Sequence, residues 1–126
     1  MEELIKAAKK ARLRAYAPYS DWQVGAALKS KEGKIYSGCN IENASYGLSM
    51  CAERVALFKA VSEGVTDFEA LVLVSDREEP AAPCGACRQV LAEFALTLPV
   101  FLVNLQEKVI RTTVEELLPA VFWFKK

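Results

Sequence analysis

Histidine is absent from this chain of 126 residues. Imidazole is the commonest protein ligand for zinc and the commonest general base in enzymes. A metal site in this chain must therefore be built from thiolates or carboxylates. Any proton transfer must likewise use a group other than imidazole.

An excess of one charge sign is also lacking, because sixteen Lys and Arg residues balance sixteen Asp and Glu residues. This balance favours neither a nucleic-acid partner nor a membrane surface. No apolar run approaches the length of a membrane span, and the first fourteen residues do not resemble a signal peptide. We therefore expect a cytoplasmic protein that binds neither nucleic acid nor membrane.

What the chain does contain suits one compact domain over residues 1–126. Hydrophobic residues make up 52% of the sequence and charged residues 25%, which is enough apolar material for a core. Four cysteines are present. In a reducing compartment, cysteines spaced as Cys-x-x-Cys are typical of metal or redox sites and not of disulfides.

The first third of the chain predicts a helix followed by a β-hairpin. Apolar residues at helical spacing indicate a helix over residues 2–15, which Pro18 ends. Residues 23–28 and the run that begins at Ile35 indicate two strands that turn at Glu32 and Gly33. Glycine and alanine inside the first strand suggest that another element packs closely over it.

The rest of the chain predicts alternating helices and strands, so the sequence indicates an α/β fold. Residues 104–107 are too few for a parallel crossover, so the last two strands should form an antiparallel hairpin. The whole order predicts a three-layer α/β/α fold around a five-stranded mixed sheet. The helix that starts at Cys51 is apolar nearly all round and should be buried. We expect helices at 51–63, at 84–95 and from Thr113 to Pro119, and strands at 71–74, 100–103 and 109–110.

Three cysteines lie at the starts of two predicted helices. Cys84 and Cys87 are three residues apart, so they share one face of a first helical turn, and Cys51 begins the preceding helix. Helix N-termini stabilise thiolates. Three thiolates can hold a zinc ion and leave its fourth position open for water. We therefore predict one zinc ion per chain at these residues.

Glu53 follows Cys51 by two residues and is the candidate for proton transfer to and from such a water. The alternative is a glutamate that only complements the dipole of its helix. Three thiolates on zinc leave excess negative charge, which works against ionising the water. Arg54 and Arg88 are candidates to offset that charge.

Two other readings of the cysteines remain open. A closed structural zinc site needs a fourth ligand, and Cys39 is the remaining thiol, although a cysteine in a strand is more often a core residue. A thioredoxin-like dithiol would use Cys84 and Cys87 but requires no third thiol.

The motif of residues 51–54, together with residues 83–89, resembles the homotetrameric, zinc-dependent cytidine deaminases that act on nucleosides. Further segments resemble the same family, in the same order, so that the similarity covers nearly the whole chain. They are residues 17–20, 24–28, 38–44 and 113–119.

The resemblance implies a cytidine deaminase-like fold and hydrolysis of cytidine and deoxycytidine to uridine, deoxyuridine and ammonia, in pyrimidine salvage. Glu53 would be the catalytic residue, with zinc on Cys51, Cys84 and Cys87. Asn40 and Glu42 would bind the ribose. The backbone around Ala52 and Cys84 would hold the pyrimidine edge, and Arg54 would donate to the ligand sulfurs.

The resemblance also implies a homotetramer with shared active sites, in which Ala44, Tyr46 and Phe122 contribute. Residues 121–124 are large and apolar, which is typical of an interface. The alternative is that this tail folds back onto its own core. Trp22 stands where the family usually has phenylalanine beside the nucleoside.

Three other functions stay possible at this point. They are a deaminase of a related base or nucleoside analogue, a zinc-stabilised scaffold without catalysis, and an enzyme that edits RNA or DNA. The balanced charge disfavours the last of these.

Overall fold

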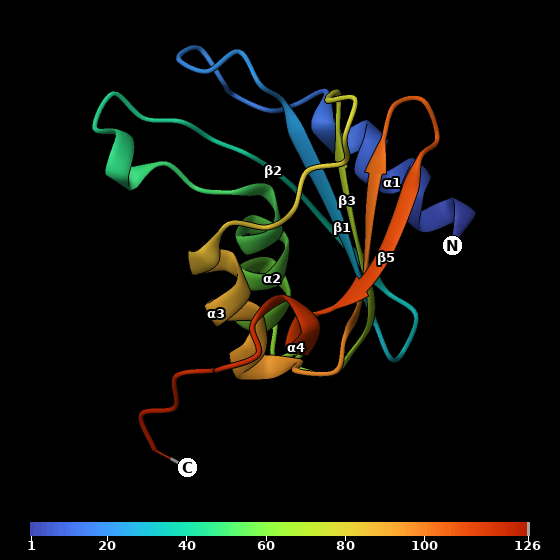
Figure 1. Ribbon diagram of the computed structural model, residues 1–126, viewed down its shortest axis with the longest axis vertical. Coiled ribbons are helices and arrows are strands. Elements are labelled where there is room, and N and C mark those ends of the chain that lie inside the picture. The colour runs from blue at the N-terminus through green and yellow to red at the C-terminus, as the bar shows by residue number, and fades with distance from the viewer. Residues whose placement is uncertain (126) are drawn as a thin grey trace.

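The computed structural model describes residues 1–125 as five strands with helices packed on both faces (Figure 1). The strands are β1 (Val24–Ser30), β2 (Ile35–Cys39), β3 (Phe68–Ser75), β4 (Pro99–Asn104) and β5 (Val109–Thr113). The helices are α1 (Glu2–Arg12), α2 (Ala52–Ser62), α3 (Gly85–Phe94) and α4 (Val114–Leu117), with a 3-10 turn η1 (Tyr46–Leu48).

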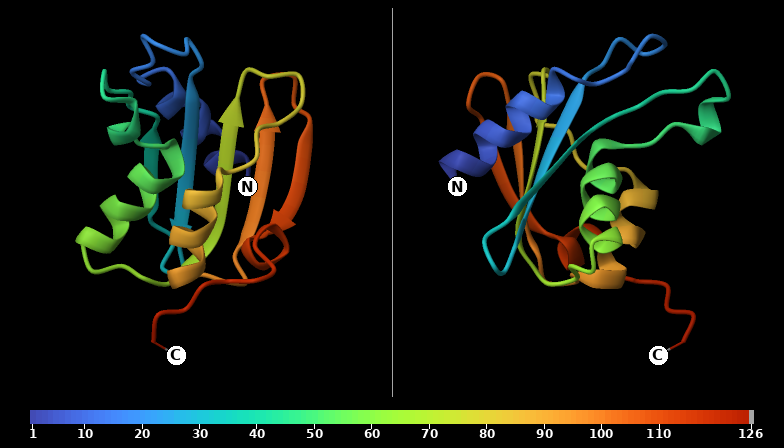
Figure 2. Two further views of the ribbon diagram at one scale, coloured as in Figure 1. Left: turned by 60° about the vertical axis from the view of Figure 1, so that its left-hand side comes forward. Right: turned by 180° about the vertical axis from the view of Figure 1, so that it is seen from behind.

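One mixed sheet with the strand order β2-β1-β3-β4-β5 forms the middle layer. The β3 and β4 strands are parallel, and every other neighbouring pair is antiparallel, including the β4–β5 hairpin. Helix α1 covers one face of the sheet, while α2 and α3 cover the other (Figure 2). The predicted three-layer fold and the predicted terminal hairpin are therefore confirmed.

The connections decide where the helices begin. Helix α2 joins β2 to β3, which run in the same direction on either side of β1, and α3 joins β3 to β4. Crossovers between parallel strands have a fixed hand, so consecutive crossovers in one direction along the sheet pack on the same face. Helices α2 and α3 accordingly lie side by side, and both start at the end of the sheet where β2 and β3 terminate (Figures 1 and 2).

Two glycines let helices approach the sheet more closely than any side chain would allow. A Cβ atom on Gly25 would lie 2.1 Å from the carbonyl oxygen of Ala8 in α1. A Cβ atom on Gly38 would lie 2.5 Å from the carbonyl oxygen of Ala52 in α2. The expectation that an element packs closely over the first strand is thus confirmed, and that element is α1.

The helix layers enclose two apolar clusters, one on each face of the sheet. The larger cluster lies between the sheet and α2 and α3, and includes Leu28, Leu57 and Leu91. The smaller one lies beneath α1 and includes Leu4 and Val72. The larger cluster therefore packs α2 and α3 against the sheet, with both helices beginning at the end where β2 and β3 terminate.

The structure extends two predicted strands, β3 to Phe68–Ser75 and β5 to Val109–Thr113, and it differs from the sequence expectation at two helices. Helix α1 ends at Arg12 and not at residue 15, because the chain turns there before Tyr16 bridges to Ile41. Helix α2 is buried along one side only, and Phe58 on its outer side is 43% exposed. Within residues 1–125, that outer side is not fully covered.

The helices are also short. The longest in the described part of the chain have 11 residues, whereas a membrane crossing needs about 20 apolar residues. Within residues 1–125, no helix has the length and apolar character to cross a membrane.

The contact at Gly25 gives a test of this packing. We expect Gly25→Ala to lower the free energy of unfolding by roughly 3 kcal/mol, because the new methyl group would collide with the backbone of α1. Gly47→Ala is the matched control, since a Cβ there would meet nothing within 4 Å. Urea unfolding of both variants measures the difference, and equal midpoints would contradict the proposed close packing.

Candidate active site

Two of the predicted thiols occupy the N-cap positions of neighbouring helices. Cys51 caps α2 and Cys84 caps α3, both with extended backbone angles, and neither thiol bonds to the backbone of its own helix. Cys87 lies one turn into α3 and is buried. Because α2 and α3 start at the same end of the sheet, the beginnings of these two helices bring the three thiols together.

The spacing of the sulfurs fits a zinc ion. The Sγ atoms of Cys51 and Cys84 are 3.7 Å apart, and those of Cys84 and Cys87 are 3.3 Å apart. Sulfurs that bind one zinc ion tetrahedrally at ~2.3 Å lie about 3.8 Å from one another. All three Sγ atoms fall within 4.8 Å of each other. Cys39 is not part of this group in the described chain, so a closed site of four cysteines gains no support.

The environment of these thiols favours a thiolate at Cys51. The thiol of Cys87, the guanidinium of Arg54 at 3.5 Å and the thiol of Cys84 hydrogen-bond to its sulfur and lower the pKa of Cys51 to about 5. The pKa of the Cys87 thiol is raised, because it hydrogen-bonds to Cys51 and is buried. A positive side chain is therefore already placed where anionic ligands need one.

Of the two arginines predicted to offset the thiolate charge, only Arg54 donates to a thiol among the described residues. Arg88 instead donates to the carbonyl oxygens of Pro83, at 2.8 Å, and Leu117, at 2.9 Å. These bonds tie the start of α3 to the end of α4. Arg88 thus fixes the helix that carries two of the thiols.

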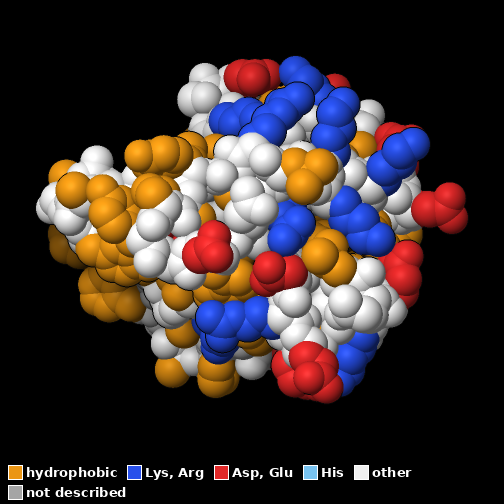
Figure 3. All heavy atoms as spheres, turned by 90° about the horizontal axis from the view of Figure 1, so that it is seen from above, with side chains coloured by type: hydrophobic (Ala, Val, Ile, Leu, Met, Phe, Trp, Pro, Cys, Tyr) orange, Lys and Arg blue, Asp and Glu red, His pale blue; other side chains and the backbone are white. Residues whose placement is uncertain are grey.

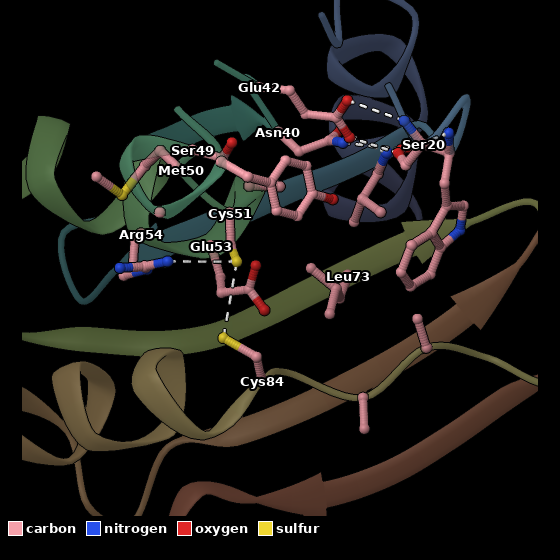
Figure 4. A pocket seen from close by; sticks show the side chains of 17 residues that line it. Ser20, Asn40, Glu42, Ser49, Met50, Cys51, Glu53, Arg54, Leu73 and Cys84 are labelled. Atoms are coloured by element: carbon pink, nitrogen blue, oxygen red, sulfur yellow. Dashed lines mark hydrogen bonds between the residues drawn. The ribbon is translucent and has the colours of Figure 1, made fainter. Parts of the chain in front are cut away.

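Glu53 lies beside the thiols with its carboxylate directed into a cavity (Figure 4). Its side chain is nearly inaccessible, with 3% of the residue exposed. Burial, together with the neighbouring Cys51, raises the pKa of the Glu53 carboxyl to about 7. A carboxyl group with a pKa near neutrality can both accept and release a proton at neutral pH. A glutamate that only complemented the helix dipole would not need such burial.

The cavity has a volume of about 350 Å³, which is in the range of small-molecule sites. It brings together most of the residues predicted from sequence. Those in its lining are Trp22, Asn40, Glu42, Tyr46, Cys51, Ala52, Glu53, Arg54 and Cys84.

The end of the cavity across from the thiols is polar, and its side chains are hydrogen-bonded (Figure 4). One oxygen of Glu42 accepts hydrogen bonds from the backbone N–H groups of Tyr19, at 3.0 Å, and Ser20, at 3.1 Å, and the Ser20 hydroxyl donates to the other oxygen. These bonds lower the pKa of Glu42. Asn40 accepts from the N–H of Val24 and donates to the carbonyl of Trp22, both at 2.8 Å.

Ser20 is the residue at this end that sequence reasoning missed. It lies in a loop segment typical of turns, and nothing in its local pattern indicates that its hydroxyl reaches Glu42, 22 residues later. The only available signal was its place in a segment that resembles the family.

Ala44, Tyr46 and Phe122 lie on the surface and not in a closed site. The loop with η1 projects from the body of the molecule (Figure 2), and Tyr46 is 61% exposed. Figure 3 shows hydrophobic side chains gathered on the side of the molecule that carries this loop. Ala44 is exposed in the same loop, and of these three residues only Tyr46 lines the cavity.

Two aromatic rings of the C-terminal tail, those of Phe122 and Phe124, do not fold onto the core. Phe122 is 67% exposed and Phe124 is 94% exposed, whereas Val121 packs on the larger cluster. The tail is held through its backbone: Gln89 donates to the carbonyl oxygen of Phe122 at 2.9 Å and accepts from its N–H at 3.4 Å. The Phe122 ring consequently faces away from the chain that carries it.

Comparison with known proteins gives consistent matches over the chain. The family model described as "Cytidine and deoxycytidylate deaminase zinc-binding region" matches residues 1–103. A cytidine deaminase of Sporosarcina psychrophila is 56% identical over 123 residues, which is 97% of this chain and 90% of that protein. A cytidine deaminase of Halalkalibacterium halodurans is 57% identical over 120 residues, or 94% and 91% of the two chains.

The fold matches a solved structure equally well. The crystal structure of cytidine deaminase from Burkholderia pseudomallei has a TM-score of 0.93 and 52% sequence identity, and the match covers 96% of this chain and 98% of that one. The zinc-binding family model and the cluster of three thiols together indicate that zinc is the cofactor.

The ligand set can be tested through the metal content. We expect purified Cys87→Ser to lose zinc on dialysis, since one thiolate of three is removed and affinity falls by at least about tenfold. Cys39→Ser should keep its zinc, because Cys39 lies outside the cluster. Elemental analysis of both variants measures this. Loss of zinc from Cys39→Ser would instead indicate a closed site of four thiolates.

Proposed function

Because this chain belongs to the cytidine and deoxycytidylate deaminase family, we propose that it hydrolyses cytidine and deoxycytidine to uridine and deoxyuridine with release of ammonia. The observation that carries this proposal is the buried carboxyl group of Glu53 beside three clustered thiols, at one end of a cavity large enough for a nucleoside. We propose that this reaction serves pyrimidine salvage and that the protein works in the cytoplasm.

Cys51, Cys84 and Cys87 hold the zinc ion in this proposal, and their spacing supports that role. Zinc supplies Lewis acidity that lowers the pKa of a coordinated water toward ~7. Arg54 offsets part of the thiolate charge through its hydrogen bond to Cys51. The positive ends of α2 and α3 act in the same direction.

Glu53 is the group that moves protons. Its carboxylate takes a proton from the attacking water and delivers it to the ring nitrogen next to the carbon that carries the amine. It then takes the second proton of that water, from the hydroxyl group now bonded to the ring carbon, and passes it to the departing amine, which leaves as ammonia. The pKa of about 7 supports this role, because neither the acidic nor the basic form is scarce at neutral pH.

The remaining contacts divide the cavity into a base end and a sugar end. The backbone at Ala52 and Cys84 lies beside the thiols and holds the pyrimidine edge. Asn40 and Glu42 bind the ribose hydroxyl groups. Ser20 supports this assignment, since its bonds to Glu42 keep that carboxylate ionised and oriented.

We propose that four copies of the chain assemble and complete one another's sites. Ala44, Tyr46 and Phe122 are the residues that neighbouring copies contribute. The exposure of Tyr46 and Phe122, and of Phe58 on the outer side of α2, supports an assembly, because isolated soluble chains rarely leave apolar surface of this extent uncovered.

Glu53→Gln tests the proton-transfer role. We expect kcat for cytidine to fall by about 10²–10⁴-fold, because the amide cannot accept and return the proton. Zinc content should not change. The ultraviolet change on conversion of cytidine to uridine measures the rate. Glu63→Gln is the control, since Glu63 lies exposed at the other end of α2 and pairs with Lys34.

Two results would contradict this proposal. Near-normal turnover by Glu53→Gln would remove Glu53 from the chemistry. Failure of the unmodified, zinc-loaded chain to convert cytidine, together with turnover of cytosine, guanine or blasticidin S, would assign the site to a related amine.

Mixing two variants tests the shared site. Phe122→Ala and Glu53→Gln should each have low activity, but a mixed assembly contains sites with both residues intact. We expect activity after mixing and reassembly to exceed the sum of the separate activities. Sedimentation should give a mass four times that of the chain. A monomer in sedimentation, or strictly additive activity, would overturn the shared site.

A further inference from the structure

Trp22 lines the cavity, and no hydrogen bond of its indole ring, within the described residues, fixes the orientation of that ring. Its backbone is fixed, because its N–H donates to the Ser20 hydroxyl at 3.1 Å and its carbonyl accepts from Asn40 at 2.8 Å. The indole N–H, however, is buried and has no acceptor among the residues that the structure describes. A buried tryptophan N–H is usually paired. Packing must therefore hold the ring in place.

Arg77 provides that packing. Its guanidinium carbon lies 3.8 Å from the centroid of the Trp22 ring, well inside the distance at which a cation is attracted to an aromatic face. Two other cation–ring contacts among the described residues are longer, at 5.0 Å for Lys34 and 5.7 Å for Arg111. The Arg77 contact is thus the closest of the three.

Arg77 is exposed, and two nearby carboxylates pair with other cations. Asp76 pairs with Arg12 at 3.3 Å, and Glu79 pairs with Lys108. Arg77 itself forms no salt bridge within residues 1–125. It is also absent from the lining of the cavity, whereas Trp22 is part of that lining. The Trp22 ring is therefore a direct route by which Arg77 can influence a bound molecule.

The contact joins two walls of the cavity. Arg77 belongs to the segment between β3 and α3, which also carries the lining residues Ala81, Ala82 and Cys84. Trp22 belongs to the segment before β1, next to Ser20. The stacking therefore fixes the polar end of the cavity relative to the wall that leads to the thiols.

We propose that Arg77 is a positioning residue for nucleoside affinity: it holds the Trp22 indole in place at the sugar end of the cavity before the nucleoside arrives. This inference rests on the proposed function. A ring that is ordered in advance lowers the cost of binding. Glu53 and the thiols lie across the cavity from Ser20, Asn40 and Glu42 (Figure 4), so the effect falls on binding and not on the chemical step.

A direct contact between Arg77 and a substrate phosphate is the competing role, and the geometry disfavours it. Arg77 does not line the cavity, and the ionised Glu42 stands at the end where a phosphate on the sugar would lie. The carboxylate would repel a second anion there. The site is thus suited to a nucleoside and not to its 5′-phosphate.

Arg77→Ala provides the kinetic test. We expect KM for cytidine to rise about three- to tenfold, with kcat within about twofold of the unmodified chain. Arg77→Lys, which keeps the cation, should restore KM to within about twofold. Arg111→Ala is the matched control, because it removes a cation–ring contact with Phe101 outside the cavity lining. Its KM should not change.

A double-mutant cycle tests the route of the effect. Arg77→Ala should raise KM much less in a Trp22→Leu background than in the unmodified chain, because the ring through which Arg77 acts has been removed. Equal increases in both backgrounds would overturn the inference. So would a loss confined to cytidine 5′-monophosphate, which would make Arg77 a phosphate contact.

Trp22 fluorescence separates this inference from the proposed reaction. In a Trp123→Phe background Trp22 is the sole tryptophan, since the chain has two. Uridine titration should then show the same three- to tenfold loss of affinity in Arg77→Ala, and acrylamide should quench Trp22 more strongly. A chain that binds uridine without deaminating cytidine contradicts the reaction alone. Unchanged uridine affinity in Arg77→Ala overturns the role of Arg77, and a chain that binds no nucleoside contradicts both.

Discussion

Helices α2 and α3 both begin at the end of the sheet where β2 and β3 terminate, and the site depends on this constraint. Both helices cross between strands that run in the same direction, so both begin where β2 and β3 end. Gly38 has no side chain, and α2 therefore settles directly on β2. The N-caps Cys51 and Cys84 consequently meet at 3.7 Å, with Glu53 just inside α2. A small shift of either helix along the sheet would separate the thiols.

Two buried carboxylates sit in one cavity and have opposite acid–base properties. Glu53 lies in a buried position next to Cys51, and burial raises its pKa to about 7. Glu42 accepts three hydrogen bonds from Tyr19 and Ser20, and its pKa is lowered. Environment alone gives one carboxylate a pKa near neutrality and the other a lowered pKa. In the proposed reaction, Glu53 would take the place of the imidazole that many hydrolases use, in a chain without histidine.

Local patterns were enough to predict the layers, the terminal hairpin and the three thiols. Each depends on short-range rules, such as helical spacing, turn residues and the length of the segment between β4 and β5. The contacts that sequence reasoning did not find join distant segments: Ser20 with Glu42, and Trp22 with Arg77, which is 55 residues away. No periodicity encodes such pairs, because loop geometry decides them. The outer side of α2 was mispredicted for another reason: its apolar residues are uncovered within the described chain, and only the proposed assembly would cover them.

The side-chain amide of Gln89 pairs with the backbone of Phe122 as a neighbouring β-strand would. It offers one donor and one acceptor to the backbone of Phe122, in the manner of a peptide group in a ladder. The attachment of this segment therefore does not depend on which side chain residue 122 carries. The exposed rings of Phe122 and Phe124 contribute little to the stability of a lone chain. Substitution of these rings should therefore leave the domain folded. The segment at Phe122 can therefore change the shape and chemistry of the exposed surface while the domain behind it stays folded.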